Sequence, residues 1–317
     1  MSKVDLGWKK SIPEARDRLQ SRLLMGIVGA LLILETIAVL RSVYFILREQ
    51  RLRENALLIE IVGISVVFAG LVLSLRAATA AGALFGGFIC FLLISGTTSS
   101  ESMVVRSGLA PLALLFVLTF LATRAGRAVK TRAGLAEKRH GRSAAQVIAN
   151  LSIAGLAVSG LGFELVTGGG VCCGGEYYRV WVWPGMMIVC LAAMVEATAD
   201  TVSSEIGQAF GGRPVMLISM RPMDPGTDGA VTLLGSVAGT AGGALVAAAG
   251  MWALRLSVSQ AAIAWFAGIC GLFFDSFLGA TVERKGWIGN DLVNFSSTVF
   301  AAGLAAGIYR YVESLGI

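Results

Sequence analysis

Acidic residues at the ends of two apolar runs mark the part of this sequence that could do chemistry. Glu196 and Asp200 leave the apolar run 180–195, and Glu205 follows them. Because residues four apart share a face of a helix, Glu196 and Asp200 would point the same way, whereas Glu205 joins them only if the helix ends or bends. Asp275 ends another apolar run and, like Asp200, is followed by a hydroxyl residue. We expect the two aspartates at the same membrane face.

Carboxylates at a membrane boundary suit Mg²⁺, which takes one or two of them together with substrate phosphates and keeps most of its waters. Acidic residues inside a membrane span are functional by default, because burying them in lipid is costly. We therefore predict that Asp200, Glu205 and Asp275 are the catalytic acids and bind Mg²⁺. The alternative is that acids at the end of a buried helix face water or cap the next helix.

Basic residues in the stretch 124–146 are candidate phosphate ligands, because glycines interleave with the cations there. The candidates are Lys130, Arg132, Lys138 and Arg139. Positive charge beside a membrane also sets topology or contacts anionic lipid head groups, so that interpretation stays open.

Two further stretches offer polar groups to a nucleotide. Gly226 and Thr227 lie in a glycine-containing turn before an apolar run, where free N–H groups at a helix start bind phosphate. Asn290 and Asn294 share one helical face at the start of the last apolar run. Capping explains Asn290 but not Asn294, so we predict that both orient substrate.

The composition indicates the elements that must position these groups. The chain has 317 residues, 56% hydrophobic and 15% charged, with a mean hydropathy of +0.75. Runs of about 20 apolar residues are typical of membrane helices. We predict an all-α, polytopic helical membrane protein with about nine transmembrane helices (range seven to nine). The expected spans are 23–40, 56–75, 77–95, 109–123, 147–166, 180–199, 229–251, 260–280 and 294–312.

Basic loops are retained in the cytoplasm, which orients these spans. We expect the N-terminus and the loops 124–146, 199–228 and 281–293 to be cytoplasmic, in the inner membrane if the source is a prokaryote. The loop 41–55 is basic yet falls outside, so the first segment could be re-entrant or miscounted. We divide the chain into a basic N-terminal segment (1–22), which could begin an interfacial amphipathic helix, an accessory span with its loop (23–55), and a kinase-like membrane domain (56–317).

Other reactive residues carry weaker signals. Cys172 and Cys173 are adjacent in a glycine-rich loop and could form a vicinal disulfide. His140 is the single histidine and is expected on a solvated face among cations. Glu35 and Glu60 lie within apolar runs and could pair with arginines.

In order, these motifs resemble those of a membrane family, domain of unknown function ninety-two, which includes transmembrane protein 19 and the phytyl-phosphate kinases of tocopherol synthesis. The resemblance covers about residues 56–312. Its pieces are 122–130, 134–150, 199–207, 226–229, 275–280 and 290–295. Val202, Asp228, Ala230 and Glu283 depart from the family's usual residues.

The resemblance implies a membrane-embedded kinase that transfers a phosphoryl group from a nucleoside triphosphate, with CTP as the expected donor, to an isoprenoid (phytyl-type) monophosphate. Because the nucleophile is already a phosphate oxygen, catalysis reduces to positioning and charge neutralisation, with Mg²⁺ as the expected cofactor. The isoprenoid tail would lie between helices. Expected partners are the isoprenoid lipid phosphate, the nucleotide and membrane lipid, and no nucleic acid.

Two other classes compete. An ion- or proton-coupled transporter would use Glu60, Glu196, Asp200 and Asp275 as a relay, and discontinuous glycine-rich helices would favour it. A CDP-alcohol transferase would carry a D-x-x-D-G…D-x-x-x-D signature, which this sequence lacks.

Overall fold

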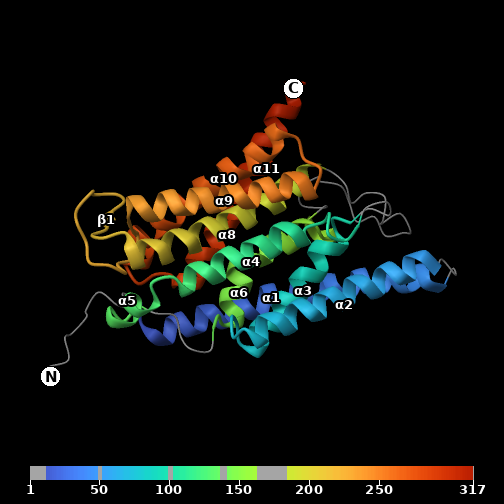
Figure 1. Ribbon diagram of the computed structural model, residues 1–317, viewed down its shortest axis with the longest axis horizontal. Helices are drawn as coiled ribbons and strands as arrows, with labels where there is room; N and C mark the ends of the chain where they lie inside the picture. The colour runs from blue at the N-terminus through green and yellow to red at the C-terminus, as the bar shows by residue number, and fades with distance from the viewer. Residues whose placement is uncertain (1–11, 49–51, 99–102, 136–140, 163–183, 317) are drawn as a thin grey trace.

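The computed structural model describes residues 12–48, 52–98, 103–135, 141–162 and 184–316, and helices dominate these ranges (Figure 1). The first half contains α1 (Glu14–Arg48), α2 (Leu52–Ser74), α3 (Ala80–Ser95), α4 (Leu109–Arg124), α5 (Arg127–Arg132) and α6 (Ala144–Ala157). The second half contains α8 (Pro184–Phe210), β1 (Val215–Met216), β2 (Ala230–Val231), α9 (Leu233–Ala253), α10 (Val258–Leu278), the π-helical turn η1 (Gly279–Glu283) and α11 (Asn290–Ser314).

The predicted fold class is confirmed. Six of the described helices are long and apolar enough to cross a membrane, namely α1, α2, α8, α9, α10 and α11, and α3, α4 and α6 are shorter apolar helices. The departure from an all-helical chain is a small antiparallel hairpin, in which Val215 pairs with Val231 and Met216 with Ala230. It lies in the connection between α8 and α9.

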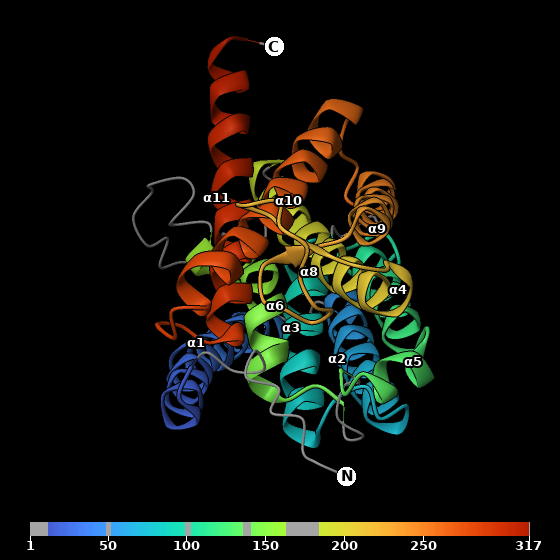
Figure 2. The same ribbon diagram turned by 90° about the vertical axis from the view of Figure 1, so that its left-hand side faces the viewer.

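Helix α8 is the centre of the bundle, as Figure 2 shows from one end of the molecule. It packs against α4, α6, α9, α10 and α11, and 94% of its apolar stretch is buried. Glycines on its neighbours permit this packing, because small residues let helix backbones approach closely in membranes. A Cβ on Gly239 of α9 would collide with the Ala199 carbonyl oxygen, and one on Gly271 of α10 would lie 2.6 Å from Glu196 Cγ.

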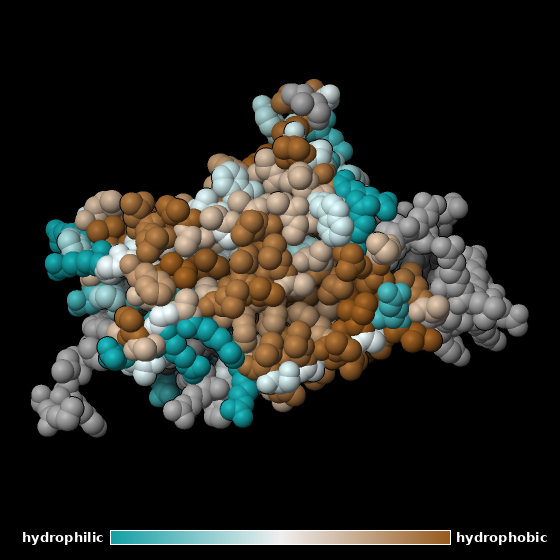
Figure 3. Space-filling model, viewed as in Figure 1, coloured by the Kyte–Doolittle hydropathy of each residue, from teal (hydrophilic) through white to brown (hydrophobic). Residues whose placement is uncertain are grey.

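The outer surface is apolar around the middle of the molecule (Figure 3). Helix α2, for example, exposes Ile59, Val66 and Val67. Hydrophilic residues gather at the end where β1 and α5 lie. This distribution fits a bilayer around the long faces of the helices, with the two ends of the bundle at its two surfaces.

Helix α8 is longer than predicted, because it continues to Phe210 instead of ending near residue 199. The residues after Asp200 are tolerated in a helix, and the first strong terminators are Gly211 and Gly212, the latter with φ of 70°. In a continuous helix, five residues turn the chain through about 500°, so Asp200 and Glu205 face directions about 140° apart. The condition under which Glu205 would join Asp200 is therefore not met.

Helix α1 also differs from the prediction, since one helix from Glu14 to Arg48 replaces an interfacial segment followed by a span. Its first turns are attached to the turn before α11. Arg16 Nη1 donates to the Gly286 carbonyl (2.9 Å), Gln20 Nε2 donates to the Trp287 carbonyl (2.8 Å), and Ser21 Oγ donates to Asp291 Oδ2 (2.6 Å).

Because α1 and α2 are both full-length helices, the first span is not re-entrant. The end of α1 and the start of α2 lie at the end of the bundle away from β1 and α5 (Figure 1).

The connections after α4, α8 and α10 share one end of the bundle (Figure 2). Gly126, at the start of α5, lies against Ala209 and Phe210, and Gly229 lies against Ala280 of η1. The start of α1 meets the same end through Gly286. The described parts of the loops 124–146, 199–228 and 281–293 thus lie on one face, as the sequence predicted, and the cytoplasmic side remains a prediction.

This arrangement predicts a labelling pattern. In a variant lacking the native cysteines, single cysteines replacing the exposed residues Arg132, Arg213 and Lys285 should react with a membrane-impermeant maleimide from one side of the membrane only. We expect that side to be the cytoplasm.

Ser257→Cys, between α9 and α10 at the other end, is the matched control and should react from the opposite side. Reaction of Arg132→Cys and Arg213→Cys from opposite sides would contradict the fold.

Candidate functional site

A polar cavity of about 150 Å³ lies where α8, α10, η1 and the start of α11 meet the loop before α9. Its carboxylates are Asp200, Asp228, Asp275 and Glu283. The other polar lining residues are Ser203, Ser204, Gln208, Thr227, Thr232, Ser276 and Asn290. Asp200, Asp275, Gly226, Thr227 and Asn290, which lie far apart in the sequence, therefore line one cavity.

The two aspartates meet because α8 and α10 point the same way and approach the cavity with their C-terminal halves. Asp275 accepts a hydrogen bond from Ser297 Oγ of α11 (3.2 Å). It lies within electrostatic reach of Glu196, Asp200 and Glu283. Neighbouring carboxylates repel one another in a medium of low dielectric constant, so this cluster favours a bound cation.

The loop that closes the cavity is shaped by a turn. The Thr227 amide donates to the Asp224 carbonyl (3.2 Å), with Pro225 and Gly226 between them and a φ of 87° at Gly226. This is the pattern of a type II turn, which requires a positive φ at its third residue. The Thr227 hydroxyl donates to the same carbonyl (2.7 Å), which fixes the loop further.

The glycine turn does not begin α9, contrary to the expectation that it would present helix N–H groups. Strand β2 intervenes, and Thr232 Oγ1 caps α9 by accepting from the Gly235 amide (3.0 Å). Gly229 is required for a different reason, since a Cβ there would collide with the backbone of Ala280. The loop is thus pressed against η1, whose last residue, Glu283, is buried.

Asp228 and Glu283, which depart from the family's usual residues, both line this cavity. Burial raises the pKa of the Asp228 carboxyl above its usual value, and the Arg284 guanidinium opposes that shift. No pattern in the sequence predicts that these two acids lie together, because their proximity depends on the π-helical turn after α10.

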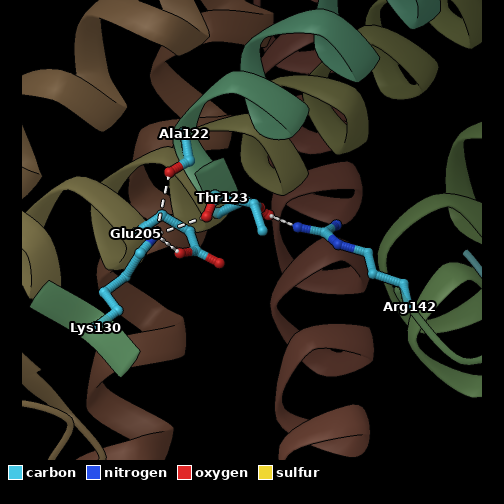
Figure 4. A network of polar contacts seen from close by, with 6 residues as sticks. Ala122, Thr123, Lys130, Arg142 and Glu205 are labelled. Atoms are coloured by element: carbon cyan, nitrogen blue, oxygen red, sulfur yellow. Dashed lines mark hydrogen bonds and ion pairs between the residues drawn. The ribbon is translucent and has the colours of Figure 1, made fainter. Parts of the chain in front are cut away.

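Glu205 lies elsewhere, paired with Lys130 (Figure 4). The Lys130 ammonium donates to Glu205 Oε2 (2.5 Å) and to the carbonyls of Thr123 (2.8 Å) and Ala122 (3.2 Å). An ammonium has three N–H donors, so these bonds use all of them. Lys130 is only 1% exposed, and it joins α5 to the end of α4 and to α8. The structure therefore gives Lys130 and Glu205 an architectural contact, and their phosphate and metal ligation stays a prediction.

The other predicted residues divide in the same way. Arg132 is exposed and lines neither of the two cavities described for this chain. Lys138 and Arg139 lie outside the described residues, as do His140, Cys172 and Cys173. Asn290 lines the polar cavity, whereas Asn294 Nδ2 donates to Asn150 Oδ1 of α6 (3.2 Å).

The residues present suit Mg²⁺ with two protein carboxylates, Asp200 and Asp275. Within the described ranges no three acidic, histidine or cysteine side chains are grouped to hold a metal ion. Mg²⁺ needs no such group, because it keeps waters and takes phosphate oxygens. Glu196 lies just behind the cavity, almost fully buried, and its Oε2 has no hydrogen-bond partner among the described residues.

A second cavity, of about 840 Å³, was not predicted from the sequence. It lies between α2, α4 and α6, and four arginines line it: Arg76, Arg124, Arg127 and Arg142. Arg142 connects it to the polar cavity, since its Nη2 donates to Thr201 Oγ1 of α8 (3.2 Å; Figure 4) and its charge acts on Asp200. Three of these arginines lie in the basic stretch 124–146, but nothing in the sequence distinguished them from its other cations.

Comparison with known proteins places this architecture. The family model described as integral membrane protein DUF92 matches residues 63–302. The chain belongs to this family. It is the family that the motifs resembled, and the match covers both cavities.

Several relatives share part of the chain. A membrane protein of Synechocystis described as uncharacterised is 31% identical over 205 residues, which cover 64% of this chain and 74% of that protein. The chloroplastic protein VTE6 of Arabidopsis thaliana is 28% identical over 191 residues, 59% of this chain and 54% of VTE6. A membrane protein of Methanocaldococcus jannaschii, also described as uncharacterised, is 33% identical over 119 residues, 38% of this chain and 50% of that protein. The chain thus matches about half the length of VTE6 and of the Methanocaldococcus protein. No solved structure matches the chain.

The Lys130 network predicts a loss of stability. Lys130→Met keeps an apolar stem but leaves Glu205 and the Thr123 carbonyl without the ammonium, while the Ala122 carbonyl keeps the Ala125 amide. We expect the free energy of unfolding to fall by about 3–5 kcal/mol. The melting temperature of the purified protein in detergent should fall by roughly 10 °C. Arg132→Met, on the exposed side of the same short helix, is the control and should melt within a degree or two of wild type. A wild-type melting temperature for Lys130→Met would exclude the architectural role.

Proposed function

We propose that this protein is a membrane-embedded kinase that transfers a phosphoryl group from a nucleoside triphosphate to an isoprenoid lipid monophosphate. The observation that carries the proposal is the polar cavity in which Asp200 and Asp275 meet Gly226, Thr227 and Asn290 at one face of the membrane bundle. The resemblance of these motifs to phytyl-phosphate kinases, and membership of the family, support it.

The reaction needs few groups from the protein. A terminal oxygen of the lipid monophosphate attacks the γ-phosphorus, a new P–O bond forms, and the bond to the β–γ bridging oxygen breaks. The nucleoside diphosphate leaves with that electron pair, and the lipid becomes a diphosphate. The attacking oxygen is already ionised near neutral pH, so no general base is required.

In this proposal Asp200 and Asp275 would hold Mg²⁺, and the ion would supply positive charge to the transferring phosphoryl group. The loop 226–229 lies beside the triphosphate, and Asn290 orients it. Ser297 holds Asp275 in position through its hydrogen bond. CTP is the proposed donor, and comparison with ATP, GTP and UTP tests which base the protein prefers.

The transporter alternative receives less support. Transporters of that type place acids at the membrane midplane beside discontinuous helices. Here α8 runs unbroken from Pro184 to Phe210 and α9 from Leu233 to Ala253. The acids of the cavity lie beside the loops at one end of the bundle, where a nucleotide from water could reach them.

The direct test is a phosphoryl-transfer assay. Purified protein in nanodiscs should convert phytyl monophosphate to the diphosphate with γ-labelled CTP and Mg²⁺, and label should not transfer when Mg²⁺ is chelated. ATP, GTP and UTP measured in parallel identify the donor. No transfer with any of the four nucleotides would refute the proposed function.

Two neutral substitutions should separate catalysis from folding. Asp200→Asn and Asp275→Asn keep side-chain size but remove the charge that binds Mg²⁺, so kcat should fall at least about a hundredfold. Melting temperatures should stay near that of wild type.

The control is Glu313→Gln, an exposed acid near the end of α11, which should turn over as wild type does. A near-normal kcat in Asp200→Asn would show that Asp200 is not a metal ligand.

A further inference from the structure

The large cavity changes in character along its length. Its arginines come from helix ends: Arg76 follows α2, Arg124 ends α4, Arg127 begins α5, and Arg142 precedes α6. Deeper in the same helices the lining is apolar and aromatic, with Phe68 and Val72 of α2, Leu115 and Phe116 of α4, and Leu151 of α6. The cavity is thus cationic at the site-bearing face and apolar towards the bundle interior.

Local contacts hold the cationic end in shape. Arg124 lies over the Phe120 ring (3.9 Å to the centroid) and its Nη2 donates to the Leu75 carbonyl (3.0 Å), which links the ends of α4 and α2. The Arg142 amide donates to the Ala77 carbonyl (2.9 Å), and the Thr79 amide donates to the Arg142 carbonyl (2.9 Å). These two hydrogen bonds fasten the turn after α2 to Arg142, just before α6.

Arg76 has an unfavourable backbone conformation for its residue type. Its φ is 54°, and the Ala77 amide donates to the Val72 carbonyl (3.0 Å), as in a Schellman motif. Glycine is preferred at that position, and other residues are retained there when something else requires the side chain. Here the position directs an arginine to the cavity lining.

The lining matches one chemical class of ligand. Arginine forks bind phosphate oxygens in pairs, and no carboxylate is among the described residues of the lining. The aromatic wall, with Phe68 and Phe116 in edge contact at 5.7 Å, suits a hydrocarbon chain. The volume falls in the usual range of about 300–1,000 Å³ for small-molecule sites.

We propose that this cavity is the acceptor site, which holds a phosphate monoester of a single hydrocarbon chain. The phosphate lies among Arg76, Arg124, Arg127 and Arg142, and the chain lies along Phe68 and Phe116. The assignment as acceptor rests on the proposed function. It is supported by Arg142, which donates a hydrogen bond to Thr201, the residue after Asp200. A phosphate bound beside Arg142 would lie at the edge of this cavity nearest Asp200, next to the triphosphate end of a nucleotide at the polar cavity.

Binding without turnover is the test, using the full-length protein in phosphatidylcholine nanodiscs with labelled phytyl monophosphate and neither nucleotide nor Mg²⁺. Arg76→Gln and Arg127→Gln should each raise Kd about tenfold, because each removes charge-assisted hydrogen bonds to the phosphate. Arg213→Gln, which replaces an exposed arginine outside both cavities, is the matched control and should bind as wild type. Phytol should bind weakly and equally to all four proteins.

The apolar end has its own readout. Phe116→Ala should weaken binding of phytyl monophosphate but not of isopentenyl monophosphate, whose chain is too short to reach that wall. Retained binding of the short ligand also shows that the variant is folded. If Phe116→Ala bound both ligands as tightly as wild type does, the proposed position of the chain would be wrong.

Other results would overturn the assignment. Unchanged binding in Arg76→Gln and Arg127→Gln would place the lipid phosphate elsewhere, and the kinase proposal would stand if wild-type transfer occurs. Displacement of phytyl monophosphate by phosphatidylglycerol in the nanodisc would make this a site for a bilayer phospholipid. Binding as expected without transfer from any nucleotide would preserve the cavity's ligand and refute both the proposed function and the acceptor role.

Discussion

Close packing around α8 is the constraint on which the rest of the structure depends. Lipid supplies no hydrophobic drive between helices, so association relies on van der Waals contact and on polar groups that find partners inside the protein. The glycines of α9 and α10 bring those helices against α8 at the level of Glu196 and Ala199. Carboxylates that would be prohibitively costly in lipid are thereby enclosed by protein and open towards one face.

The same helix separates two opposite charges. On one side of α8 the polar cavity gathers Asp200, Asp275 and Glu283, and on the other side the second cavity gathers four arginines. Arg142 and Thr201 join the two sides through one hydrogen bond. A negatively charged donor with its cation and a negatively charged acceptor can be held close together only if each has its own compensating charges.

The buried Lys130 shows how the fold maintains this separation. Its ammonium is fully hydrogen-bonded and fixes α5 to the end of α4 and to Glu205, which removes one carboxylate from the reactive side of α8. Arg124 ends α4 and Arg127 begins α5, so the position of α5 against α4 also places two arginines at the second cavity. The buried Lys130 thus helps to hold the exposed Arg124 and Arg127 at the second cavity.

The sequence by itself determined the fold class and singled out two aspartates that line the polar cavity. Long apolar runs rich in glycine and alanine can be stable only as packed membrane helices, and two such runs ending in Asp and a hydroxyl residue predicted that Asp200 and Asp275 approach each other. The order of the motifs was enough to indicate the family. These features depend on residues close to one another in the sequence, so the sequence alone predicts them.

Only the tertiary structure decided which charged side chains face which neighbours. Glu205 and Lys130 carried the same sequence signal as their neighbours, yet the unbroken course of α8 to Phe210 turned Glu205 away from Asp200 and towards α5. The π-helical turn after α10 brought Glu283 and Asp228 to one cavity. The arginine cavity depends on contacts between residues 75–79, 124 and 142, which lie far apart in the chain. Side-chain direction depends on helix ends and on packing partners, and a pattern of residue types does not specify either.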